Sequence, residues 1–376
     1  MRHLSTSQVL EEIKGILHHA PKIIRFVDRT FNDLPERALD IWRFLVNQPG
    51  ETLFHFEMAP DRFTGDMFQF LEGVNPGRFQ FELGVQSMNP KTLETINRRC
   101  DLAKLGTNVR KLLAKDNIHI HLDLILGLPY EDKESFHSSF AYVFGLGAHY
   151  IQMGLLKLLP DTPMSKSVEE YGLVVCGSPP YELLANRWLA KTELEELFWF
   201  GECVEAFHNN RFFRSLWDYL RKTNEDIAAF FQALLALCRA RGFFDLAHTQ
   251  ELMSFLLLEL SRERSDGELF REILVFDWLR CGHHFLPDHL EKEPLSDLKK
   301  RLWSQLPQNW DGIYEYKNRD EFFKQSVFSR FSGKFLKETG LADDNNGGYI
   351  CFLTQRENTV FRLSSFLPIP LSFTKS

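Results

Sequence analysis

Two hydrophobic patterns alternate along roughly the first 160 positions of the chain. Short runs rich in isoleucine, phenylalanine and valine predict strands, and segments with an apolar residue at every third or fourth position predict helices between them. The strands are expected at 22–28, 53–57, 79–85, 118–126 and 150–158, and the helices at 7–17, 37–46, 61–71, 102–115 and 133–144. Strand–helix repetition of this kind forms a parallel sheet with right-handed crossovers. The pattern therefore predicts an α/β fold, built on either an open doubly wound sheet or a barrel.

The beginning of the chain departs from this repetition. It opens on a helix, for which Ser5 and Ser7 are candidate N-caps, whereas a repeat of strands and helices should open on a strand. We therefore expect a first strand and the loop after it to be missing from this sequence.

The pattern changes from about residue 182 onward. Long helical stretches with paired aromatic residues, which favour helix packing, continue to about residue 306. Alternating residues at 349–353 and 359–363, with turn residues at 345–348, predict a small β element near 345–365. The Gly177-Ser178-Pro179-Pro180 stretch interrupts regular structure, so we expect the linker at 175–180. The domains are therefore predicted as 1–174 and 181–376, the second mostly helical.

Composition excludes several classes of protein. The formal net charge of −7 gives no sign of a nucleic-acid-binding face, and no stretch is long and apolar enough for a membrane span. The start lacks the apolar core of a secretory signal, so a cytoplasmic location is expected. The six cysteines form no CxxC pair and are interpreted as reduced, buried thiols.

Polar residues stand where the predicted strands end. The turns carry neither GxGxxG nor GxxxxGK[ST], so both common nucleotide-binding fingerprints are absent. The strand ends instead carry Asp28, Glu57, Gln86 with Ser87, and Lys157. Sites in parallel α/β folds form beyond the carboxyl ends of strands, so we expect these residues to line one.

Two groups of residues raise the question of a metal. His119, His121 and Asp123 share one face of a strand, as in metal-dependent hydrolases on barrels, or they line a barrel interior. Cys281, His283, His284 and His289 fit no common zinc spacing and are interpreted as the polar end of a helix. No metal site is predicted.

Between residues 26 and 163 the sequence resembles the radical S-adenosylmethionine superfamily, in its cobalamin-binding branch. Several segments carry the resemblance in the family's order: 26–32 (FVDRTFN), 54–58 (FHFEM), 84–87 (GVQS) with 93–99 (LETINRR), 122–129 (LDLILGLP) and 156–163 (LKLLPDTP). The resemblance implies a partial (β/α)6 barrel lacking its first strand, followed by a helical C-terminal domain of unknown function.

The same resemblance implies residues that bind S-adenosylmethionine. The family's contacts fall on Glu57, Gln86, Arg98 and Asp123, with Ser87 in the same motif as Gln86, and Asp28 stands where the family holds the aminopropyl end. Alternatives stay open. Arg98 could cap its helix or pair with Asp101, Arg99 could replace it, and Asp123 could bond inside the barrel.

The family binds a [4Fe–4S] cluster through a CxxxCxxC loop, and this sequence has no such motif. The resemblance therefore implies an N-terminally truncated radical enzyme that binds S-adenosylmethionine and is inactive alone, with the cluster and cobalamin expected in a full-length form. Its substrate is an unidentified small molecule or peptide. The alternatives are a non-catalytic binding or scaffold module, and a metal-dependent hydrolase.

Overall fold

The computed structural model describes residues 4–28, 30–291, 320, 324, 326–341, 347–358 and 363–369, with side chains up to residue 352. The chain divides into two compact units. The first comprises Met1–Glu205 with Asp226–Ala228, and the second comprises Ala206–Glu225 with Ala229–Ser376. No described helix combines the length and the apolar character that a membrane span needs.

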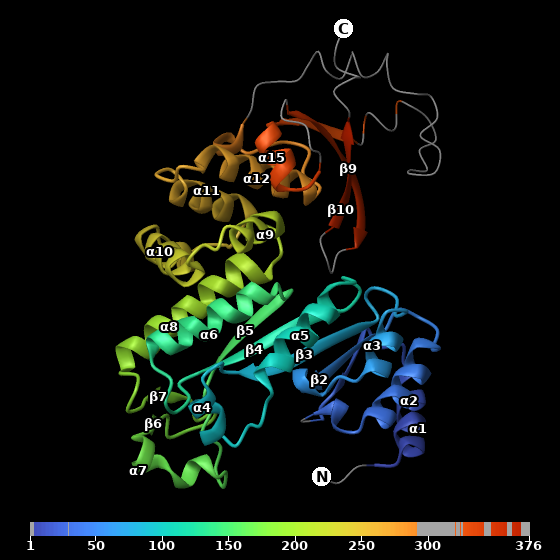
Figure 1. The fold of residues 1–376 in the computed structure, drawn as a ribbon, viewed down its shortest axis with the longest axis vertical. Coiled ribbons are helices and arrows are strands. Elements are labelled where there is room, and N and C mark those ends of the chain that lie inside the picture. Colours follow the sequence, from blue (N-terminus) through green and yellow to red (C-terminus); the bar gives the residue numbers. More distant parts are fainter. Residues whose placement is uncertain are drawn as a thin grey trace. The chain divides into compact units, whose positions relative to one another are not determined.

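A five-stranded parallel sheet organises the first unit (Figure 1). Its strands lie side by side in chain order: β1 (Ile23–Phe26), β2 (Leu53–Met58), β3 (Phe79–Gln86), β4 (His119–Leu126) and β5 (Tyr150–Leu155). Each strand predicted from an apolar run is present, and the α/β class is confirmed. The closure of a (β/α)6 barrel and the missing first strand stay predictions.

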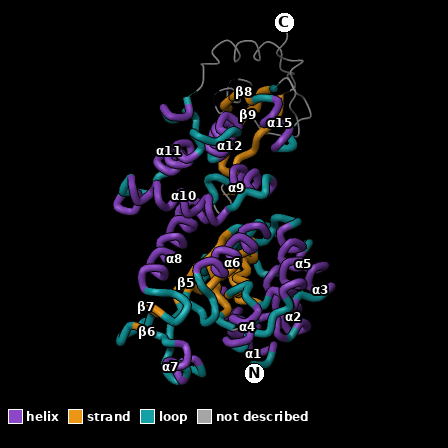
Figure 2. Tube along the Cα trace, turned by 60° about the vertical axis from the view of Figure 1, so that its left-hand side comes forward, coloured by secondary structure: helices purple, strands orange, loops and turns teal. Residues whose placement is uncertain are grey.

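Helices precede, connect and follow the strands of this sheet (Figure 2). They are α1 (Thr6–Leu17), α2 (Pro35–Val46), α3 (Gly65–Leu71), α4 (Pro90–Thr95), α5 (Leu102–Leu113), α6 (Lys133–Leu146), α7 (Val168–Tyr171) and α8 (Lys191–Val204). Ser5 is the N-cap of α1 and accepts from the Gln8 amide in a capping box, whereas Ser7 lies inside the helix.

One predicted helix begins later than expected. The sequence predicted a helix over 61–71, but Pro60–Arg62 forms a separate 3-10 turn, and α3 begins at Gly65. The helix begins there because Thr64 is its N-cap. The Thr64 backbone is extended, and its hydroxyl accepts from the Met67 amide.

Aromatic packing fixes which face of the sheet the helices cover. Trp42 of α2 is fully buried, with its ring 6.0 Å from that of Phe79 and 5.5 Å from that of Phe81. Alternate residues of β3 are buried against this layer, and the residues between them point to the other face. We call that second face the polar face, because it carries most of the ionisable residues of the sheet.

The predicted linker lies within the first unit. Val174–Val175 and Leu183–Ala185 form a small hairpin, β6 and β7, and the turn at 177–180 is its tip. The Leu183 amide donates to the Leu156 carbonyl at 2.9 Å, and Asn186 donates to the Gly127 carbonyl at 2.9 Å. These bonds hold the hairpin to the end of the sheet, and the first compact unit continues to Glu205. The predicted domains 1–174 and 181–376 stay a prediction.

The second unit combines helices with a small sheet. Its elements are α9 (Arg214–Lys222), α10 (Ile227–Ala240), α11 (Gln250–Leu260), α12 (Gly267–Arg280), β8 (Ser326–Phe331), α15 (Gly333–Glu338), β9 (Gly348–Asn358) and β10 (Leu363–Ile369). The last three strands form an antiparallel sheet in the order β10-β9-β8. The predicted strand at 349–353 lies within β9, while residues 359–362 of the predicted strand at 359–363 and residues 345–346 of the predicted turn lie outside the described residues.

A buried ion pair within α12 also contacts the start of α9. The Asp277 carboxylate of α12 is fully buried, and Arg280 donates to it at 3.2 Å. The same carboxylate accepts from the backbone amides of Ser215 and Leu216, at 3.2 and 3.1 Å, in the first turn of α9. Asp277 therefore satisfies a helix N-terminus and a buried guanidinium together.

Candidate functional site

Three carboxylates meet on the polar face. Glu57 of β2 is in register with Glu82 of β3, and Gly84 of β3 is in register with Asp123 of β4. Glu82 and Asp123 lie close enough on this face that the charge of Glu82 raises the pKa of Asp123. On its other side Glu82 lies 3.1 Å from Nε2 of His55. We call Glu57, Glu82 and Asp123 the acidic cluster.

The carboxylates of the acidic cluster do not share one environment. Burial, followed by the charge of Glu82, raises the pKa of Asp123 well above its ordinary value. Burial also raises the pKa of Glu57, and the charge of Glu82 adds to that shift. The hydrogen bond from His55 instead lowers the pKa of Glu82. The pKa values of Asp123 and Glu57 are thus shifted in the opposite direction from that of Glu82.

A polar cavity of about 420 Å³ opens beyond the carboxyl ends of β2 and β3. We call it the rim cavity. It is lined by Thr30, Ala59, Asp61, Arg62, Gln86, Ile96, Asn97, Arg98, Arg99 and Cys100. With its three arginines, the cavity has the chemistry to bind an anionic group such as a carboxylate.

Gly84 separates the rim cavity from the acidic cluster. Arg98 donates to the Gly84 carbonyl. A Cβ on Gly84 would lie 2.5 Å from Nε2 of Gln86 and 3.0 Å from Nη2 of Arg98. Since Asp123 is the register partner of Gly84, glycine lets the side chains of the cavity lie directly beside the cluster. Arg98 of the cavity and Asp123 of the cluster thus lie on either side of Gly84, and the charge of Asp123 acts on the pKa of Arg98.

Gln86 occupies an unusual backbone conformation. Its φ is +72°, in the left-handed region, and the register with β4 shifts between Gly84 and Gln86. A bulge of this kind re-aims a side chain at the end of a strand. Here it supplies Gln86 to the rim cavity.

Ser87 lies below the site rather than in it. The side chain is fully buried, and its hydroxyl donates to Oε1 of Glu131 at 2.6 Å. The Ser87 hydroxyl oxygen accepts from the backbone amide of Asn89 at 3.0 Å, and Glu131 also accepts from the Ser139 hydroxyl at 3.1 Å. This network fixes the turn that follows Gln86, so the structure gives Ser87 a positioning contact with Glu131.

The other predicted residues divide into two groups. Gln86 and Arg98 line the rim cavity, and Glu57 and Asp123 belong to the acidic cluster. Asp28 follows β1, and its charge contributes to raising the pKa of Glu57. Asp101 caps α5 through the amides of Ala103 and Lys104, and Arg98 donates to the Gly84 carbonyl.

The residues considered for a metal have other contacts. His121 lies 2.9 Å from His119, nitrogen to nitrogen, and 2.5 Å from the Gln80 amide. His283 is stacked on Trp278 with ring centroids 4.1 Å apart, and His289 lies 2.7 Å from the Ser254 hydroxyl. Within the part of the chain that the structure describes, no group of three or more His, Cys, Asp or Glu residues is arranged to hold a metal ion.

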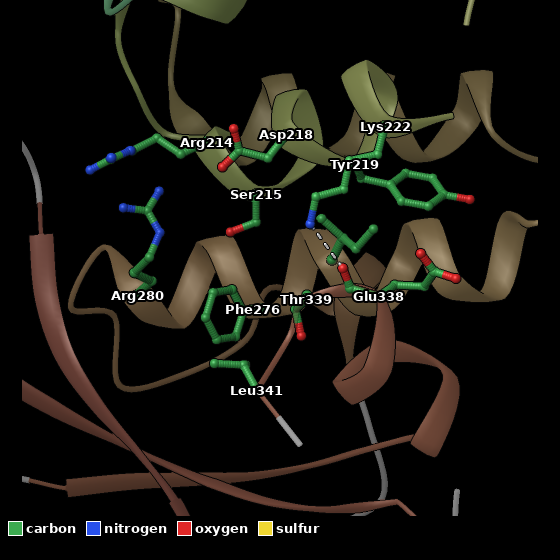
Figure 3. Close-up of a pocket in the computed structure, with 11 residues that line it drawn as sticks. Arg214, Ser215, Asp218, Tyr219, Lys222, Phe276, Arg280, Glu338, Thr339 and Leu341 are labelled. Atoms are coloured by element: carbon green, nitrogen blue, oxygen red, sulfur yellow. Dashed lines mark hydrogen bonds between the residues drawn. The ribbon is translucent and has the colours of Figure 1, made fainter. Parts of the chain in front are cut away.

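A second cavity, of about 200 Å³, lies in the second unit (Figure 3). Arg214 and Arg280 point to one side of it, and Lys222 donates to the Glu338 carbonyl at 3.1 Å. Ile273, Phe276 and Leu341 supply apolar surface. This cavity is small and combines basic with apolar groups, and it includes none of the residues predicted from the sequence.

The comparisons with known proteins agree with the resemblance. Residues 169–352 match a family described as "Protein of unknown function (DUF4080)". The chain is 26% identical over 270 residues to 2-(S-pantetheinyl)-carbapenam-3-carboxylate methyltransferase of Streptantibioticus cattleyicolor. The aligned region covers 64% of this chain and 39% of that protein. It is 30% identical over 257 residues to the cobalamin-dependent radical SAM methyltransferase TokK of Streptomyces tokunonensis, covering 59% of this chain and 36% of TokK.

Among solved structures, the radical S-adenosylmethionine methyltransferase TsrM from Kitasatospora setae aligns with a TM-score of 0.40 and 18% identity, over 47% of this chain and 36% of TsrM. The sequence similarity to TokK, a cobalamin-dependent radical S-adenosylmethionine methyltransferase, confirms the predicted resemblance to that branch of the superfamily. The chain spans well under half the length of these curated relatives.

The described residues fit S-adenosylmethionine but not an iron–sulfur cluster. Asp123 Oδ1 is buried without a hydrogen-bond partner among the described residues, beside a cavity rich in arginine. This arrangement fits a ligand that carries both a carboxylate and a cation, as S-adenosylmethionine does. An iron–sulfur cluster needs several thiolates together, and the described residues include no such group. The described residues do not fit a cluster.

Proposed function

We propose that the first unit binds S-adenosylmethionine across the rim cavity and the acidic cluster. The observation that carries this proposal is the pairing of opposite charges around Gly84. Arg98 lies on the cavity side, within reach of a ligand carboxylate, and Asp123 lies on the other side with a buried, unpaired oxygen. S-adenosylmethionine has a carboxylate at one end of its amino-acid part and two positive groups, an ammonium and a sulfonium, close by.

In the superfamily, a bound [4Fe–4S] cluster cleaves S-adenosylmethionine to a 5′-deoxyadenosyl radical, and in the cobalamin-dependent branch the outcome is often methyl transfer. The residues of this chain have a narrower part in the proposal. Arg98 and Gln86 orient the ligand, the acidic cluster neutralises its positive charge, and the Ser87–Glu131 network keeps Gln86 in place.

Titration calorimetry with S-adenosylmethionine tests the binding. Replacing Arg98 with leucine should weaken binding at least tenfold, because a charged hydrogen bond to a carboxylate contributes about 1.5–3 kcal/mol. Gly84→Ala should also weaken binding, because the new Cβ displaces Gln86 and Arg98 while both side chains remain.

Arg43→Leu is the matched control. Arg43 is an exposed arginine of α2 paired with Asp40, and it is remote from the site in the sheet. The control should bind like the wild type. If the wild-type chain shows no binding at millimolar ligand, the site is not a cofactor site, and the scaffold alternative gains support.

We further propose that this chain does not cleave S-adenosylmethionine by itself, because the sequence contains no CxxxCxxC motif. Purified chain treated with iron and sulfide under argon should hold no stoichiometric four-iron cluster and form no 5′-deoxyadenosine. Formation of both would refute the inactivity while leaving the binding proposal intact.

A further inference from the structure

We propose that Asn32 and Asn108 are positioning residues of the S-adenosylmethionine site, because their buried side-chain amides hold the turn at residues 59–62 that forms part of the rim cavity. This inference rests on the proposed function, since it concerns the same ligand site. It gives a role to two residues for which neither the sequence motifs nor the comparisons supplied one.

The turn at residues 59–62 follows β2 and supplies Ala59, Asp61 and Arg62 to the lining of the rim cavity. It contains a single 3-10 turn, Pro60–Arg62, in which the Arg62 amide donates to the Ala59 carbonyl at 3.3 Å. An element this short makes too few internal bonds to fix its own geometry. The positions of its side chains therefore depend on bonds from neighbouring elements.

Asn32 binds this turn through both atoms of its side-chain amide. The side chain is fully buried in the loop that follows β1. Its Nδ2 donates to the Ala59 carbonyl, and the Ala59 amide donates to its Oδ1, each at 2.9 Å. A pair of bonds of this kind fixes both the distance and the orientation of the two segments. Since Thr30 of the same loop also lines the rim cavity, Asn32 sets the spacing between two parts of the lining.

Asn108 holds the same turn from α5. Its side chain is buried, and its Nδ2 donates to the Pro60 carbonyl at 3.0 Å. A further bond comes from the N-cap of that helix, where the Asp101 backbone amide donates to Oδ2 of Asp61 at 3.1 Å. The segment 96–100, which contributes two arginines to the cavity, directly precedes this cap. These bonds therefore connect the turn to the part of the lining that is rich in positive charge.

Loss of either amide should disturb the cavity rather than the fold alone. Asn32→Ala removes the acceptor of the Ala59 amide, and Asn108→Ala removes the donor to the Pro60 carbonyl. A buried backbone group that loses its partner moves to find another one, because leaving it unpaired is costly. A ligand site needs its groups held within about 0.5 Å of the productive geometry, so such a movement lowers affinity.

Titration calorimetry of the full chain with S-adenosylmethionine measures the effect. Asn32→Ala should weaken binding about tenfold or more, and Asn108→Ala, which removes one bond instead of two, about threefold or more. Lower stability alone does not change the affinity of a chain that stays folded, so urea unfolding of each variant selects conditions in which it is folded. Where Asn32→Ala does not fold, Asn108→Ala carries the test.

Asn117→Ala is the matched control. Asn117 is 8% exposed, as is Asn108, and its Nδ2 donates to the Leu71 and Val74 carbonyls, both at 2.8 Å. It precedes β4 and does not line the rim cavity, so its replacement should lower stability and leave affinity unchanged.

Wild-type affinity in both Asn32→Ala and Asn108→Ala overturns this inference and leaves the binding proposal standing. The same holds if Asn117→Ala loses as much affinity as they do. A wild-type chain that does not bind the ligand overturns both.

Discussion

Replacing Asp277 with alanine should destabilise the second unit by about 3–5 kcal/mol, which is the usual cost of removing one partner from a buried ion pair. The change leaves the Arg280 guanidinium, which is 4% exposed, without its carboxylate. It also removes the acceptor for the Ser215 and Leu216 amides at the start of α9. Both losses act on the contact between α9 and α12.

Urea unfolding, followed by tryptophan fluorescence, measures this effect, since Trp217 and Trp278 lie on these two helices. Asp40→Ala is the control, because Asp40 forms an exposed ion pair with Arg43 and should change stability by less than about 1 kcal/mol. A loss in Asp277→Ala no larger than in the control would show that the pair does not stabilise the unit.

The second large effect concerns Glu131 and pH. The side chain is fully buried, its hydrogen-bond donors are the hydroxyls of Ser87 and Ser139, and burial raises its pKa from 4.5 to about 7. A carboxyl whose pKa is raised by folding stabilises the fold below its unfolded pKa, and this contribution is lost as pH rises through the folded pKa. The wild type should therefore lose about 3 kcal/mol between pH 4.5 and pH 8 at this site.

Glu131→Gln should remove that pH dependence, because the amide oxygen still accepts from Ser87 and Ser139 but no longer ionises. The check is the free energy of unfolding at pH 5 and pH 8. Glu134→Gln, an exposed change in the following turn, should keep the wild-type slope. The interpretation is wrong if Glu131→Gln retains the same slope as the wild type.

The strands were predictable because their apolar runs are local. The start of α3 was not, since a hydroxyl of Thr64 decides it and the apolar spacing of 61–71 does not show that cap. The extent of the first compact unit depends on bonds between the hairpin at 174–185 and the end of the sheet, which join residues far apart in the sequence.

The site was predictable only in part for a related reason. Glu57, Gln86, Arg98 and Asp123 stand at the family's contact positions, whereas His55 lies in the 54–58 segment without a predicted role and Glu82 lies outside the quoted segments. Their importance depends on the register of β2, β3 and β4, and pairing between distant strands sets that register. Counting every second residue along the strands could have pointed to Glu82, but not to its place beside Asp123.

The left-handed backbone of Gln86 has a consequence for protein engineering. A residue other than glycine at a φ of +72° stores about 1–3 kcal/mol of conformational strain, which asparagine or glycine would relieve. A screen that selects only for heat resistance should therefore favour Gln86→Gly or Gln86→Asn. The selected variants would keep their fold but lose the Gln86 side chain from the rim cavity. Selection for thermostability in this chain must therefore be paired with selection for ligand binding.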